Sequence, residues 1–90
     1  MNKKLLCNIE LFNLNQNIYT VDIDTGDIDL VATTTLDSIV KTISILSHTM
    51  SISNISLIGS IGFGEQIAKD IIEYSKTNYG NNINLEIEVK

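Results

Sequence analysis

The chain has 90 residues, of which 43% are hydrophobic and 19% charged, a composition typical of a folded domain and not of a disordered segment. Its length leaves room for one hydrophobic core, so we expect a single small domain over residues 1–90. The formal net charge is −5 and the only basic residues are scattered lysines, which excludes the basic stripe of a nucleic-acid binder, so we expect no direct contact with nucleic acid.

The first third of the chain has the alternating pattern of β-strands. Residues 3–12 carry apolar side chains on both faces, which predicts a strand that is at least partly covered on both sides. An amide-rich turn at 13–17 separates this strand from a second one at 18–23. A hairpin turn around Gly26 then leads to a third strand at 28–33. Together these segments predict a three-stranded antiparallel meander.

Apolar residues next repeat with the period of a helix, in a stripe that runs over residues 36–50. Thr34 or Thr35 can cap the start of this helix, and Asp37 lies in the first turn, where the helix dipole favours a negative charge. This stripe predicts the first of two helices.

A strand, a helix and a strand follow. Residues 54–59 read as a short buried strand, and a second helix begins after the glycines at 62 and 64. That helix ends near Gly80, which can take the left-handed conformation of a C-terminal cap. Residues 83–89 alternate cleanly between apolar and polar, which predicts an edge strand with one buried face.

The element order is therefore β-β-β-α-β-α-β. It predicts an α/β domain in which a mixed five-stranded sheet, an antiparallel meander plus parallel strands, is covered by two helices. This order resembles the ribonuclease-H-like fold, which also forms half of an actin-type ATPase domain. A fold of this type hosts many functions, so the resemblance implies topology and not activity.

Two segments are similar to those of small uncharacterised bacteriophage proteins. They are Leu-Phe-Asn-Leu-Asn-Gln-Asn-Ile-Tyr at 11–19 and Glu-Tyr-Ser-Lys-Thr-Asn-Tyr at 73–79. This resemblance implies a protein encoded by a phage or mobile element. It carries no active-site motif that could be transferred to this chain.

The residues that could form a catalytic site do not make a recognisable set. The ribonuclease-H-like resemblance implies converging acids, but the first strand offers only Glu10, Asp37 sits at a helix start, and no acid follows Gly59. Cys7 and His48 lack a third group to orient them, so we expect a buried cysteine and a histidine that favours a helix C-terminus. We therefore expect no enzyme activity, no metal and no cofactor.

A glycine-rich loop joins the fourth strand to the second helix. Gly59, Ser60, Gly62 and Gly64 could hold a phosphate or nucleotide with backbone N–H groups, which makes a small-ligand-binding protein the alternative function. The spacing matches neither the dinucleotide fingerprint nor the Walker loop. A tight turn between strand and helix is the favoured explanation of these glycines.

Four aspartates surround the hairpin turn: Asp22, Asp24, Asp27 and Asp29. A calcium loop would need a longer ligand run that ends in a bidentate acid, and the chain lacks a glutamate at that spacing. Aspartate beside glycine is ordinary turn chemistry. The four carboxylates also form an acidic patch that could imitate phosphates and occupy a basic groove of a partner.

The tyrosines of the second helix and the last strand provide further predictions about partner binding. Tyr74 and Tyr79, near the end of the second helix, either close the core or act as partner anchors. The edge strand at 83–89 is a second surface, besides the acidic hairpin, that could bind a partner protein. It could also pair with a second copy, so a homodimer or a structural homo-oligomer is a second alternative.

The single cysteine forms no internal disulfide, and no apolar run is long enough to span a membrane. The N-terminus begins like a signal peptide, but Asn8 and Glu10 interrupt its apolar region. We therefore expect a soluble, cytoplasmic protein, in the host cell if phage-encoded. The leading hypothesis is a non-enzymatic acidic interaction module, with an anti-CRISPR-like inhibitor of a host nucleic-acid-targeting defence enzyme as a sub-case.

Overall fold

The computed structural model describes residues 4–59 and 64–89. The strands and helices in these residues follow one another in the predicted order. The meander consists of β1 (Lys4–Asn13), β2 (Ile18–Asp24) and β3 (Asp29–Thr35). The second part consists of α1 (Leu36–Thr49), β4 (Asn54–Gly59), α2 (Gly64–Tyr79) and β5 (Asn84–Val89).

The strands form one mixed sheet with the order β3-β2-β1-β4-β5, so β1 lies at its centre. β2 runs antiparallel to both β1 and β3, whereas β4 runs parallel to both β1 and β5. This confirms the predicted α/β class and the edge position of β5. The ribonuclease-H-like resemblance itself stays a prediction.

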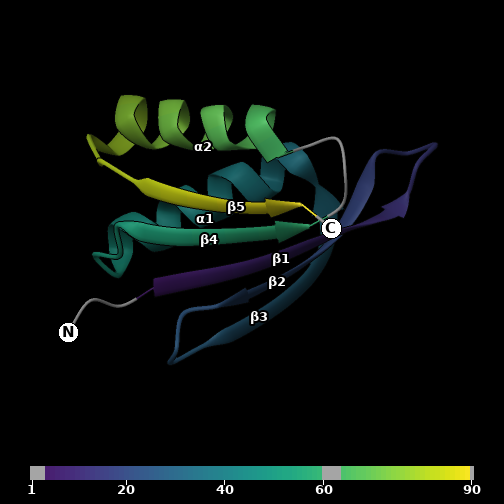
Figure 1. Cartoon of the computed structure of the whole chain (residues 1–90), viewed down its shortest axis with the longest axis horizontal. Coiled ribbons are helices and arrows are strands. Elements are labelled where there is room, and N and C mark those ends of the chain that lie inside the picture. The colour runs from purple at the N-terminus through teal and green to yellow at the C-terminus, as the bar shows by residue number, and fades with distance from the viewer. Residues whose placement is uncertain (1–3, 60–63, 90) are drawn as a thin grey trace.

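Both helices cover the same face of the sheet (Figure 1). The crossovers from β3 through α1 to β4, and from β4 through α2 to β5, move along the sheet in the same direction. Right-handed crossovers that move in one direction place their helices on one side. In the described part of the chain, no helix or strand covers the other side of the sheet.

The strand β1 shows this one-sided burial most clearly. Leu5, Cys7 and Ile9 face the helices and are at most 1% exposed, whereas Leu6 on the opposite side is 45% exposed. The prediction that this strand is at least partly covered on both sides was wrong, because no helix among the described residues packs on its second face. We call that uncovered side the open face; in β1 it carries Leu6, Asn8 and Glu10.

The ends of the helices follow the predicted signals. Thr35, with extended backbone, caps α1, and its Oγ1 accepts a hydrogen bond from the backbone N–H of Ser38 at 3.3 Å. Gly80 follows α2 with φ +67° and donates its N–H to the carbonyl oxygen of Lys76 at 3.0 Å. These caps fix where each helix begins or ends over the sheet.

Small polar residues are buried where α1 and α2 pack over the sheet. Ser44 of α1 and Ser75 of α2 are both fully buried. The Ser75 hydroxyl accepts a hydrogen bond from the Asn81 side chain at 3.1 Å. Within the described residues, the Ser44 hydroxyl has no hydrogen-bond partner. A buried hydroxyl without a partner is destabilising, so Ser44 is a position where the fold can be improved.

Replacing Ser44 by alanine is expected to raise the free energy of unfolding by about 1 kcal/mol, because it removes an unsatisfied buried hydroxyl and improves helix propensity. For a domain of this size that corresponds to a rise in Tm of about 4–8 °C, measurable by thermal denaturation. Ser75→Ala is the matched control, since it removes a satisfied hydroxyl and leaves Asn81 without that acceptor. A gain in Ser75→Ala equal to that in Ser44→Ala would contradict the explanation.

Candidate functional site

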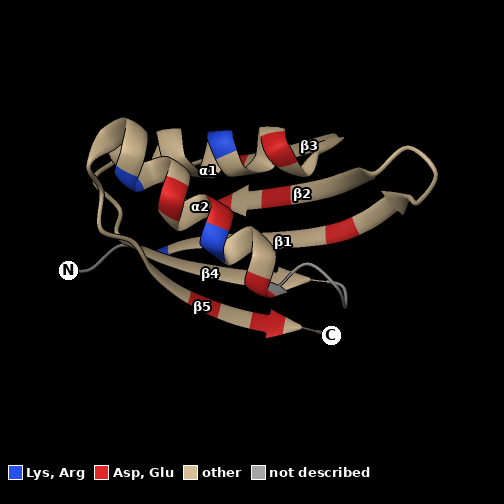
Figure 2. Cartoon of the chain, turned by 90° about the horizontal axis from the view of Figure 1, so that it is seen from above, with Lys and Arg blue, Asp and Glu red and all other residues tan. Residues whose placement is uncertain are grey.

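The open face of the sheet carries most of the acidic side chains that the strands present. Because side chains directly opposite each other in a ladder share a face, the pairing registers assign these residues to it. The acidic members are Glu10 in β1, Asp22 and Asp24 in β2, Asp29 in β3, and Glu86 and Glu88 in β5. Figure 2 shows these strands with their acidic positions in red.

Three of these carboxylates belong to one small region. Asp24 lies directly opposite Asp29, and Asp22 is two residues before Asp24 on the same strand. All three line a hollow of about 190 Å³ with Leu6 and Asn8 of the central strand. β1, β2 and β3 thus bring together residues that come from both sides of the hairpin turn.

The carboxylates in this hollow interact directly. A side-chain hydrogen bond with Asp22 raises the pKa of Asp29, and desolvation and the negative charge of Asp22 act in the same direction. Asp29 thus holds a proton more readily than an isolated aspartate would. A raised pKa of this kind is expected where two carboxyl groups lie close together at a surface.

Asparagine in place of Asp29 is expected to raise Tm at pH 7 and to flatten the pH dependence of stability. Since the folded chain raises the pKa of Asp29, it binds the proton more tightly than the unfolded chain, and stability falls as pH rises through the window above about pH 4. Thermal denaturation from pH 3 to 8 measures this. Glu88→Gln, at the far edge of the same face, controls for the loss of one charge; equal gains would contradict the Asp22–Asp29 interaction.

The turn between β2 and β3 holds the aspartates in place. Asp24 Oδ1 accepts a hydrogen bond from the N–H of Gly26 at 2.8 Å, and Gly26 has φ +91°. The buried Thr25 hydroxyl accepts from the N–H groups of Asp27 and Ile28 at 3.3 and 3.0 Å. Asp27 therefore belongs to the turn, whereas the other three predicted aspartates lie on the open face.

The predicted tyrosines lie on the opposite side of the sheet, in the helical layer. Tyr74 is half-buried and packs against the core, and its ring meets that of Tyr79 edge-to-face at 6.3 Å. Tyr79 also stacks on His48 of α1, with ring centroids 4.9 Å apart. The two tyrosines are thus a pair that joins the helix ends, and they do not share a surface with the aspartates.

The thiol of Cys7 is buried in the core, on the helical side of β1. Burial raises the pKa of this thiol, and the negative charge of Asp22 raises it further. The thiol is therefore protonated at neutral pH and is a poor nucleophile. Among the described residues, no three histidine, cysteine or acidic side chains are placed to share a metal ion.

The glycine loop is only partly within the described residues. Gly59 is the last residue of β4 and is buried, and Gly64 is the first residue of α2. Ser60 and Gly62, the other two residues of the predicted phosphate site, lie outside the described residues.

Three acidic residues of the open face, Glu10, Glu86 and Glu88, were not among the individual partner-binding residues that the sequence analysis predicted. Glu86 and Glu88 in β5 face the same side as the aspartates. Their alternation was visible in the sequence, but the shared face follows only from the pairing of β5 with β4 and of β4 with β1. Lys4 of β1 lies in the same part of the sheet and pairs with Glu86 at 2.6 Å.

Comparison with protein-family models and with curated proteins finds no match to this chain. No helix in the described part of the chain has both the length and the apolar character that crossing a bilayer requires.

Proposed function

We propose that this chain is a non-enzymatic interaction module that binds a protein partner through the acidic open face of its sheet. The observation that carries the proposal is the crowding of Asp22, Asp24 and Asp29 on two adjacent strands, where all three line one hollow. Carboxylates that line the same small hollow repel each other when they are ionised. Lysine or arginine side chains of a partner would relieve that repulsion and form charge-assisted hydrogen bonds.

The partner in this proposal is a protein with a basic groove that normally holds nucleic acid. Acidic side chains at alternate positions of neighbouring strands present repeated negative charges, as phosphates do along a nucleic acid. The net charge of −5 favours encounter with such a groove. The chain would then be an inhibitor of a nucleic-acid-targeting defence enzyme, encoded by a phage or mobile element and acting in the host cytoplasm.

The test is to purify the partner by affinity capture from the native host and to measure its affinity for the chain against salt and nucleic acid. We expect the Kd to rise by about tenfold or more between 50 and 200 mM salt, because the contacts are between charged surfaces. We also expect duplex DNA or RNA that binds the partner to displace the chain. An affinity independent of salt, or a ternary complex that holds chain and nucleic acid together, would contradict the proposal.

A further inference from the structure

The helical layer contains a cavity of about 530 Å³ between the first turns of α1 and one side of α2. This volume is within the range of about 300–1,000 Å³ that is common for ligand pockets. We call it the helix-side groove; its apolar floor consists of Tyr19, Leu36, Val40, Ile67 and Tyr74. These residues belong to the hydrophobic core or pack against it, so the groove opens onto the core.

The lining from α2 shows that the groove is elongated. The residues recur every three or four positions from Gln66 to Asn78, which places them along one side of the helix. Twelve residues at about 1.5 Å each extend over about 18 Å. An extended peptide of about five residues has the same length, at about 3.3 Å per residue. The groove therefore has the proportions of a site for a short peptide segment.

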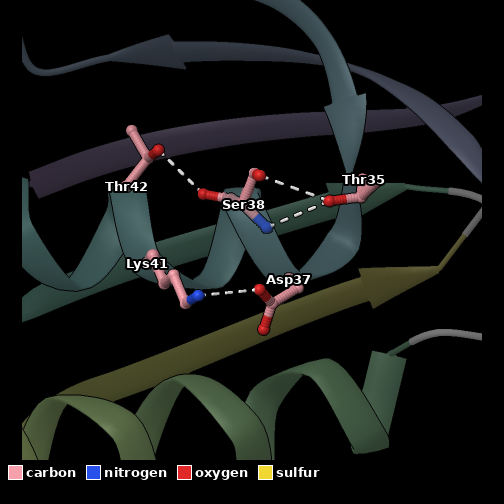
Figure 3. Close-up of polar contacts among 5 residues, drawn as sticks. All are labelled: Thr35, Asp37, Ser38, Lys41 and Thr42. Carbon is pink, nitrogen blue, oxygen red and sulfur yellow. Dashed lines mark hydrogen bonds and ion pairs between the residues drawn. The ribbon is translucent and has the colours of Figure 1, made fainter.

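The rim of the groove is acidic. Asp37 of α1 and Asp70 and Glu73 of α2 line it together with the apolar floor. Asp37 forms an exposed ion pair with Lys41 at 3.0 Å, on the side of α1 drawn in Figure 3. Asp70 accepts a hydrogen bond from Gln66 at 2.9 Å. Both contacts are at the surface, where such pairs are weak and a ligand cation can replace them.

We propose that the helix-side groove binds a peptide segment of a partner protein in which lysine or arginine flanks an aliphatic side chain. The aliphatic group packs on the half-buried Leu36 and Tyr74, and the flanking cations approach Asp70 and Glu73. The ring of Tyr74 on the floor adds a surface that attracts cations. This site lies on the other side of the sheet from the acidic open face, so it does not rest on the function proposed above.

The test uses the isotopically labelled chain and two acetylated, amidated pentapeptides, Lys-Leu-Lys-Leu-Lys and Glu-Leu-Glu-Leu-Glu, in an NMR titration. We expect the lysine peptide to shift the amide signals of the groove and to bind at least about tenfold more tightly than the glutamate peptide. Equal affinity for the two peptides would overturn the proposal, as would shifts centred on the open face. If hexylamine binds as tightly as the lysine peptide, the groove recognises a simple alkylammonium group, and the proposal of a peptide ligand is rejected.

Two double variants test whether the acidic rim of the groove is responsible for binding the lysine peptide. The double variant D70N/E73Q is expected to lose at least about tenfold in affinity for the lysine peptide, since it removes two acids of the rim. The double variant E65Q/E88Q removes the same number of charges outside the groove and is expected to bind as the native chain does. The replaced side chains are all exposed, so both variants should fold. Equal losses in the two variants would show a non-specific effect of net charge and reject the site.

Discussion

The triple variant D22K/D24N/D29K is expected to bind the partner at least about 100-fold more weakly than the native chain. Each reversed aspartate replaces an attraction to the partner's basic groove by a repulsion, and loss of a close charge pair at an interface often costs about 2–5 kcal/mol. Even 1.4 kcal/mol at each reversed position gives about 100-fold. Isothermal titration or surface-immobilised binding with the captured partner measures this loss.

The variant is designed to keep the fold. All three side chains are exposed, and asparagine at position 24 retains the side-chain oxygen that accepts the N–H of Gly26. The matched control, D37N/D70K/E73K, makes the same changes of charge on the helical side, and we expect it to retain the native affinity for this partner. Native affinity in the open-face variant, or an equal loss in the control, would remove the acidic open face as the binding surface.

The strand alternation and the helical period were enough to predict the order of elements and their approximate ends. These signals are local: the Thr35 cap, the positive φ of Gly26 and Gly80, and the alternation in β5 are set by neighbouring residues. The predicted element order, with short right-handed crossovers, then restricts the sheet to few topologies. The structure confirms the fold class for this reason.

Which face of the sheet is covered could not be read from the strands alone. Leu6 and Val31 are apolar but lie on the open face, with 45% and 69% of their surface exposed. The hydrophobicity of Leu6 suggested partial cover on this side, whereas coverage is decided by the direction of the two crossovers. A single strand pattern contains no information on that direction.

The candidate sites were harder to predict because each is assembled from distant segments. Glu86 joins the face of Asp22 only through two parallel pairings in which β4 lies between β1 and β5. The helix-side groove combines Tyr19 with residues of α1 and α2. In the sequence, Asp70 and Glu73 have the pattern of the solvent-exposed side of an amphipathic helix. They form the rim of the helix-side groove only because α1 packs beside them.

The two proposed surfaces lie on opposite layers of a thin molecule, so their effects on binding can be separated. Residues of the open face and of the helix-side groove belong to different sides of β2: Asp22 and Asp24 point to one side, Tyr19 to the other. Changes more than about 7–10 Å apart with no shared partner usually add in free energy. A variant that combines both sets should therefore bind the basic-groove partner as weakly as the open-face variant does, and the lysine peptide as weakly as the groove variant does.

Alanine in place of Leu57 is expected to lower the free energy of unfolding by about 3–4 kcal/mol. Leu57 is 1% exposed in β4, paired with Cys7 and Ile87 on the helical side, and truncation of a buried leucine leaves a cavity. A chain of this length has a total stability of roughly 5–13 kcal/mol, so the loss is a large part of it. Urea denaturation measures the change. The rate at which a maleimide labels the buried thiol of Cys7 is an independent measure of the same loss. A destabilisation of about 3 kcal/mol should raise this labelling rate by over 100-fold.

The same substitution at Leu6 tests the feature on which the proposed function depends. Leu6 lies one residue before Cys7 but points to the open face and is 45% exposed, so Leu6→Ala should cost under about 1 kcal/mol. The ratio of the losses in unfolding free energy of the two variants thus measures whether this side of the sheet is exposed to solvent in the free protein. If Leu6→Ala is as damaging as Leu57→Ala, the face is covered in solution, and carboxylates on it are then not accessible to the basic groove of a partner.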